Sequence, residues 1–276
     1  SRRSITMFEN CLLVKMTRKR PADEKYDRQA SYNYNAERET DIKIYKDLFK
    51  GNRKVNLLNN VYAEAYQYHI HHTLPWLDRG LRMIDNTQYL HYMQKMGEFR
   101  NEIDKTLKEI EPEYDNMVAT DLGRLKELGN PLDYPAFSEY SRAWQLVVEF
   151  RPVPQVGDYR VAVAQEITNG LQQQLQDLGV TTQKMLRNNL KQEFGNFMET
   201  LKKPDGERRI FDVSLTNLDE LVQRTKGLNV LNDPDLTYAL DRLTTVIPLY
   251  DVKDLRKFPE ARVDFCETMS KILETI

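Results

Sequence analysis

The stretch WQLVVEFRPVPQVGDYR, residues 144–160, decides how the rest of the chain is arranged. Its first half is rich in the β-branched and aromatic residues that favour a buried strand. Two prolines end that strand because they cannot donate ladder hydrogen bonds, and the aspartate of the following turn is placed to cap a helix. The predicted structural hub consists of Trp144, Phe150, Pro152, Pro154, Asp158 and Arg160.

Long helical patterns lie on both sides of this strand, over about residues 86–129 and 158–202. In each of these arms, apolar residues recur at spacings of three and four, which is typical of an amphipathic helix. Neither arm can bury its apolar stripe alone, so the two are predicted to pack antiparallel as a coiled-coil-like hairpin.

A second apolar run, at residues 8–17, should pair with the strand at 145–152. The predicted fold is therefore mainly α: a long helical hairpin on a helical body, with a small antiparallel β element. We expect a single domain over residues 1–276, with shorter helices from about 210 to 276.

Local breaks refine this prediction. Pro112 lies inside the first arm and predicts a kink or two consecutive helices, while Gly170 and Gly179 are the weak points of the second arm. Asp233 and Asp235 lie in an Asn-Asp-Pro-Asp sequence, and we interpret this sequence as a helix-start turn rather than a cation site. Residues 21–35 have no apolar period and are expected to form a loop.

Composition limits the classes of function. The 276 residues carry 40 basic and 42 acidic side chains, a formal charge of −2, which argues against a surface built entirely to hold nucleic acid or anionic lipid. The two cysteines lie near opposite ends, as expected in a reducing compartment. No apolar run is long enough to span a bilayer, and we expect a cytoplasmic protein without membrane contact.

The closest approach to a metal site is a group of histidines in which His69 and His72 share one face of a predicted helix. No HEXXH motif accompanies them, so we expect a polar helix end and no metal. Motifs for a nucleophile elbow, a phosphate-binding loop or a dinucleotide fold are also missing from the sequence. We therefore expect no cofactor and no catalytic residues.

Two basic clusters and a tyrosine-containing segment suggest single-stranded nucleic acid as one ligand, because aromatic rings stack on bases while cations meet phosphates. The alternative is that the basic residues close strands and helices and that the tyrosines fold back onto the protein. The candidate contacts are Arg18, Lys19, Arg20, Tyr26, Arg28, Tyr32, Tyr34, Lys202, Lys203, Arg208 and Arg209.

Four stretches, WLDRGLRMI, NPLDYPAF, EFRPVPQVGDYRVA and GLNVLNDPDL, together resemble a bacteriophage and plasmid family of unknown function. Its members are often encoded near a MoxR-type AAA+ ATPase. The resemblance covers most of the chain, brings no catalytic residues, and implies a phage protein in the host bacterial cytoplasm with that ATPase as a candidate partner.

The sequence thus favours a helical adaptor that acts through protein partners, including further copies of itself, without its own active site. Long arms expose a large area for little core, and such helices commonly pack against helices of another chain. The alternative is a single-strand nucleic-acid-binding protein that uses the basic and tyrosine-rich segment near the N-terminus.

Overall fold

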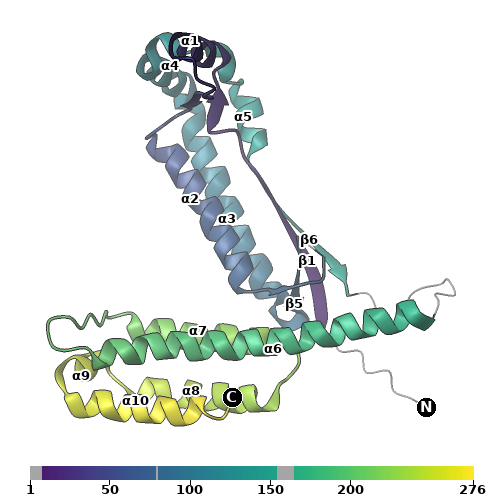
Figure 1. The fold of residues 1–276 in the computed structure, drawn as a ribbon, viewed down its shortest axis with the longest axis vertical. Coiled ribbons are helices and arrows are strands. Elements are labelled where there is room, and N and C mark those ends of the chain that lie inside the picture. Colours follow the sequence, from purple (N-terminus) through teal and green to yellow (C-terminus); the bar gives the residue numbers. More distant parts are fainter. Residues whose placement is uncertain (1–7, 79, 154–164) are drawn as a thin grey trace. The chain divides into compact units, whose positions relative to one another are not determined.

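The computed structural model describes residues 8–78, 80–153 and 165–276, without the side chains of residues 165–169 and 171. The described chain is mainly helical (Figure 1). The hub residues Pro154, Asp158 and Arg160 lie outside the described residues. The helices are α1 (Arg28–Arg38), α2 (Arg53–His71), α3 (Tyr89–Ile110), α4 (Tyr114–Leu125), α5 (Phe137–Ala143), α6 (Gln165–Lys202), α7 (Ser214–Leu228), α8 (Pro234–Val246), α9 (Val252–Lys257) and α10 (Pro259–Leu273).

The predicted strand pairing is confirmed within a larger sheet. Its antiparallel strands follow the order β4-β5-β1-β6, so the strand after Trp144 does lie next to the N-terminal strand. In the described register Leu13 pairs with Met83 and Lys15 with Leu81. The strands are β1 (Cys11–Lys19), β4 (Leu74–Pro75), β5 (Leu81–Asp85) and β6 (Gln145–Pro152), while β2 (Glu24–Tyr26) and β3 (Tyr45–Asp47) form a separate antiparallel pair.

The chain divides into two compact units, and the strands β1 and β6 each contribute residues to both. Unit 1 contains the described residues of Ser1–Lys15, Ile70–Leu90 and Phe150–Ile276. Unit 2 contains the described residues of Met16–His69 and His91–Glu149. The single domain predicted from the sequence stays a prediction.

Unit 1 has a helical core, in which α6 contacts α7 and α10, and α8 contacts α7 and α10. The side chains that α6 buries follow its apolar period, with Leu186, Leu190, Phe194 and Leu201 all turned into the core. Asp233 caps α8, because its carboxylate accepts hydrogen bonds from the backbone N–H groups of the first helical turn. The predicted helix-start turn is therefore confirmed.

The first predicted arm is two consecutive helices, as Pro112 indicated. A short 3₁₀ turn, Glu111–Glu113, separates α3 from α4. Over its described residues the second arm is continuous: α6, described from Gln165 to Lys202, passes through Gly179 without a break.

The expected coiled-coil-like hairpin is not evident in the described part of the chain. The arm around α3 and α4 belongs mostly to unit 2, whereas α6 belongs to unit 1 and packs against α7 and α10 of the same unit. The apolar stripe of α6 is thus covered by helices that follow it in the sequence. Because these helices already bury the apolar side chains of α6, burial of its stripe does not require the other predicted arm.

Two further expectations were wrong. Residues 21–35, expected to form a loop, contain β2 and most of α1, whose N-cap Asp27 accepts a hydrogen bond from the Ala30 backbone N–H. This helix buries only Ser31, so it has no apolar period that sequence reading can detect. The sequence also predicts one helix over about residues 254–275, but the structure divides this stretch at Pro259 into α9 and α10.

Candidate interaction surfaces

The first basic cluster, Arg18–Arg20, is largely committed to helix α2. The Arg18 guanidinium donates to the Tyr62 carbonyl oxygen at 3.0 Å and lies over the Tyr66 ring. Arg20 donates to the Asn59 side-chain oxygen at 2.7 Å and pairs with an aspartate three residues on. These contacts fasten the end of β1 to α2, and Lys19 is exposed.

The tyrosine-containing segment of unit 2 exposes its aromatic rings, but on different sides. The rings of Tyr26 and Tyr45 are 5.6 Å apart across the β2–β3 pair, and Arg38 lies over the Tyr34 ring. Tyr32 is 69% exposed. Because residues two apart do not share a helix face, Tyr32 and Tyr34 project in different directions from α1. Arg28, at the start of α1, is exposed.

A buried lysine holds this segment in place, and sequence reading did not find it. Lys46 lies between the carboxylates of Asp27 and Asp133, at 3.3 and 2.7 Å, and also donates to the Leu128 carbonyl oxygen. Burial alone would lower the pKa of Lys46, but the hydrogen bonds to both aspartates outweigh it and raise that pKa. The backbone N–H of Ala30 contributes most to lowering the pKa of Asp27.

A second buried carboxylate supports the neighbouring loop. Asp121 accepts hydrogen bonds from the Phe49 backbone N–H and the Tyr134 hydroxyl, both at 2.6 Å, and pairs with Arg124. Burial opposes ionisation of Asp121, yet these partners together lower its pKa. Phe49 has a positive φ of 53°, a conformation that the Asp121 contact helps to hold.

Trp144 and Phe150 have different environments. Trp144 is buried in unit 2, where its ring meets Tyr62 at 5.1 Å and Tyr140 at 6.1 Å between centroids. Phe150 is half-buried in unit 1, packed edge-on against Tyr89. Pro152 is the last residue of β6, as predicted for a proline at a strand end.

His69 takes part in the core of unit 2, where its Nδ1 lies 2.7 Å from the Tyr92 hydroxyl oxygen. His72 is half-buried one turn further along, after the end of α2. No group of three or more His, Cys, Asp or Glu that could hold a metal ion occurs among the described residues.

Burial raises the pKa of the Cys11 thiol to about 12, which keeps it protonated and unreactive.

The second basic cluster forms the connection between α6 and α7 in unit 1. Lys202 pairs with Glu199 on α6, and Lys203 offers its carbonyl oxygen to the Arg208 guanidinium, which also pairs with Asp205 at 2.7 Å. Arg209 has no hydrogen-bond or ion-pair partner among the described residues. This cluster belongs to unit 1 and the first belongs to unit 2.

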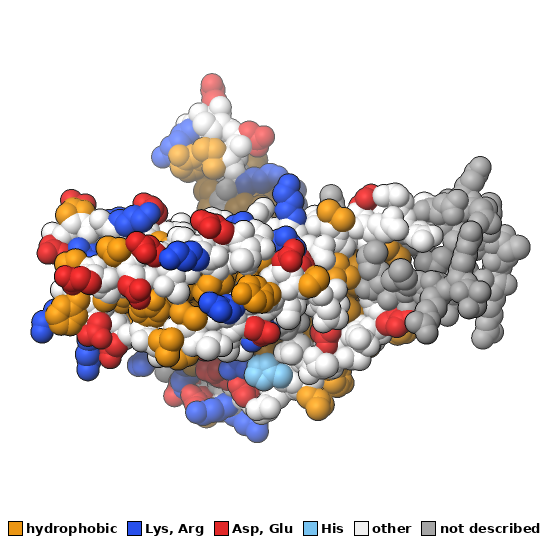
Figure 2. All heavy atoms as spheres, turned by 90° about the horizontal axis from the view of Figure 1, so that it is seen from below, with side chains coloured by type: hydrophobic (Ala, Val, Ile, Leu, Met, Phe, Trp, Pro, Cys, Tyr) orange, Lys and Arg blue, Asp and Glu red, His pale blue; other side chains and the backbone are white. Residues whose placement is uncertain are grey.

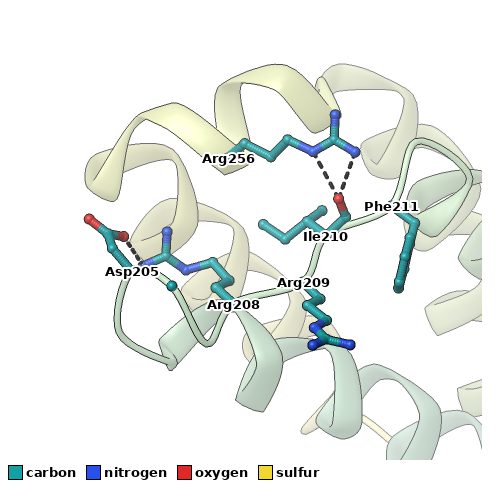
Figure 3. Close-up of a pocket in the computed structure, with 7 residues that line it drawn as sticks. Asp205, Arg208, Arg209, Ile210, Phe211 and Arg256 are labelled. Carbon is teal, nitrogen blue, oxygen red and sulfur yellow. Dashed lines mark hydrogen bonds and ion pairs between the residues drawn. The ribbon is translucent and has the colours of Figure 1, made fainter.

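A pocket of about 420 Å³ opens beside this connection (Figure 3). Arg256 of α9 closes one wall by donating from Nε and Nη2 to the Ile210 carbonyl oxygen, at 2.8 and 2.6 Å. The remaining lining residues come from the connection itself: Asp205, Gly206, Arg208, Arg209, Ile210 and Phe211. Arg256 was not among the residues singled out from the sequence, because an isolated arginine in a short helix gives no signal.

On the face shown in Figure 2, side chains of both charges alternate, with hydrophobic side chains between them. In the parts that the structure describes, none of the helices combines the length and apolar character needed to cross a membrane. Comparison with family models, curated proteins and solved structures finds no match to this chain.

Proposed function

We propose that the protein is an interaction or assembly protein, an adaptor that works by presenting helical surface to protein partners. The observation that supports this proposal is the length of α6 relative to the helices that cover it. α6 has 38 residues and is therefore about 57 Å long, whereas α7 and α10 have 15 residues each and are about 22 Å long. Figure 1 shows the N-terminal part of α6 continuing past the end of α7.

The chemistry of this projecting part suits a helix-to-helix contact. Leu175 and Leu178 are only partly buried against the core of unit 1, whereas Val180, on another side of the helix, is 66% exposed. The flanking positions are mostly glutamine, and Asp177 is the one charged residue between positions 167 and 183. A partner helix that buries Val180 would meet Asp177 and Lys184 on the same face, one negative and one positive, beside uncharged glutamines.

A second copy of the chain is the first partner we propose, because the flanks of Val180 carry one charge of each sign and have no net charge to repel a second copy. The MoxR-type AAA+ ATPase is proposed on the resemblance alone, with the host bacterial cytoplasm as the place of contact. Adaptor function through the projecting part of α6 requires that either partner engage the same helix surface.

Residue-specific cross-linking tests the proposal. In a variant with Cys266→Ser, the substitution Val180→Cys places a reachable thiol on the exposed side of α6, where its projecting part begins, while Cys11 stays buried. A bifunctional maleimide should then give covalent dimers. The matched control is Val263→Cys on α10, where the native valine is 58% exposed.

Cross-linked dimers should form efficiently at position 180 and poorly at 263. Equal yields at the two positions would reflect random collision and would remove support for docking through α6. The native protein should recover the ATPase from lysate of infected cells, and the Val180→Glu variant should not. That result would show that the ATPase binds the same surface of α6.

Single-strand nucleic-acid binding is the second candidate, and the exposed tyrosines of unit 2 favour it. The balance of charge is unfavourable, since residues 24–47 contain five basic and six acidic side chains. The test is a mobility shift with an oligonucleotide at low salt. Neutralising Lys19 and Arg28 is cleaner than neutralising Arg18 or Arg20, because those two arginines hold β1 to α2.

If the protein gives no mobility shift at low salt, this surface is not a nucleic-acid site. The same conclusion follows if the double variant Lys19→Gln, Arg28→Gln gives the same mobility shift as the native protein. The tyrosine substitution Tyr32→Ala should weaken binding if a base stacks there, because base stacking on an aromatic ring contributes about 1 to 3 kcal/mol.

A further inference from the structure

We infer that the pocket between the α6–α7 connection and α9 binds a nucleoside monophosphate, with the phosphate at Arg209 and the base against Phe211. This is a small-molecule site in unit 1 and is independent of the docking surface on α6. Its volume of about 420 Å³ lies within the range of small-molecule sites, roughly 300 to 1,000 Å³.

Arginine is the commonest residue in the lining of the pocket. Three of its lining residues are arginines, and Asp205 is the single acidic one. Two of these guanidinium groups are already used to shape the connection: Arg208 holds its start through the Lys203 carbonyl oxygen, and Arg256 holds its end through the Ile210 carbonyl oxygen. Arg256 also pairs with Asp212 at 2.6 Å.

Arg209 is the guanidinium of this pocket that remains available. It is exposed and has no hydrogen-bond or ion-pair partner among the described residues. A planar guanidinium offers two parallel N–H groups to the oxygens of a phosphate, and such bidentate contacts are strong. Because Arg208 and Arg256 fix the backbone on both sides, little ordering of the connection is needed when an anion binds.

Phe211 supplies the second part of the site. Phe211 is 63% exposed, although Ile210 beside it is buried. In Figure 3 the side chains of Arg209 and Phe211 point the same way from the connection. A free cation next to an exposed flat ring is the pairing that meets the phosphate and the base of one nucleotide.

Isothermal titration with three ligands tests the inference: adenosine monophosphate, inorganic phosphate and adenosine. The monophosphate should bind at least tenfold more tightly than either of the other two, because only it contacts both residues. Arg209→Gln should lower the affinity for the monophosphate about tenfold or more, as expected for loss of a charge-assisted contact. Phe211→Leu should lower the affinity for the monophosphate and leave the affinity for inorganic phosphate unchanged.

The matched control is Arg242→Gln, which removes one exposed arginine from α8 at a position outside the pocket. Since Arg209 and Phe211 are exposed, their variants should keep the circular dichroism spectrum of the native protein. The inference is overturned if the monophosphate does not bind at millimolar concentration, if it binds no better than inorganic phosphate, or if Arg209→Gln and Arg242→Gln have equal effects.

Discussion

Asp233 provides the sharpest test of how unit 1 is held together. Its side chain is 2% exposed and serves two neighbours at once. One oxygen accepts from the backbone N–H groups of Asp235 and Leu236 and caps α8, while both oxygens receive the Arg187 guanidinium of α6 at 2.6 to 2.9 Å. This pair ties the middle of α6 to the start of α8, and the contact with Asp233 raises the pKa of Arg187.

Three substitutions separate the two roles. Asp233→Asn keeps a side-chain acceptor for the cap and loses the charge that Arg187 contacts, so the free energy of unfolding should fall by about 2 kcal/mol. Asp233→Ala loses the cap as well and should cost about 3 kcal/mol. Asp235→Asn is the control, because Asp235 is exposed and 3.5 Å from Arg187, and it should cost less than about 0.5 kcal/mol.

Urea unfolding followed by circular dichroism measures these differences. With a denaturant slope near 2 kcal/mol per molar, Asp233→Asn should lower the midpoint of the unit 1 transition by about 1 M. If Asp233→Asn were no more destabilising than Asp235→Asn, the ion pair would contribute nothing. If Asp233→Ala and Asp233→Asn were equal, the cap would contribute nothing.

Further predictions concern the buried charges of unit 2 and the two aromatic residues of the predicted hub. Lys46→Met leaves Asp27 and Asp133 without their shared cation and should cost about 3 to 5 kcal/mol in urea unfolding. Because the pKa of Asp27 is lowered in the folded state, its contribution is present above the ordinary aspartate pKa of about 3.9 and is lost as pH falls through the lowered value. An acid titration of the native protein that showed no loss of stability in that window would contradict this. Trp144→Ala should cost about 3 to 5 kcal/mol, and Phe150→Ala roughly half as much because its ring is only half-buried; equal costs would show that burial does not distinguish them.

The sequence predicted the elements whose signals are local. The strand at 145–152 was recognisable because apolar and β-branched residues run directly into Pro152. The start of α8 followed from Asp233 before Pro234, and the break in the first arm followed from Pro112. Such positions depend on a few neighbouring residues, so one sequence is enough to find them.

The pairing of elements was not predictable in the same way. An amphipathic stripe indicates that a helix has a partner but does not identify it, and the partners of α6 within its own unit are α7 and α10. The strands β4 and β5 are two and five residues long, too short for a period of two to stand out. Helix α1 depends on a polar cap and on Ser31, with no apolar face to reveal it.

The same distinction applies to the candidate sites. A cluster such as Arg18–Arg20 was visible in the sequence, but its commitment to α2 depends on Asn59 and Tyr62, about 40 residues away. Arg209 was visible too, whereas its neighbour in the pocket, Arg256, is far along the chain. Basic residues that anchor the fold and basic residues that are free to bind a ligand look alike in a sequence. Only the structure therefore shows which basic side chains are free.

The measurement that tests the central claim most directly is the molar mass of the native protein, by light scattering after size-exclusion chromatography over a concentration series. Docking through the projecting part of α6 predicts a mass that rises from one chain towards two or more as concentration increases. Val180→Glu should stay at the mass of one chain, and the control Val263→Glu should behave like the native protein. A native protein that remains monomeric at every concentration, or a Val180→Glu variant that associates as the native protein does, would contradict the account.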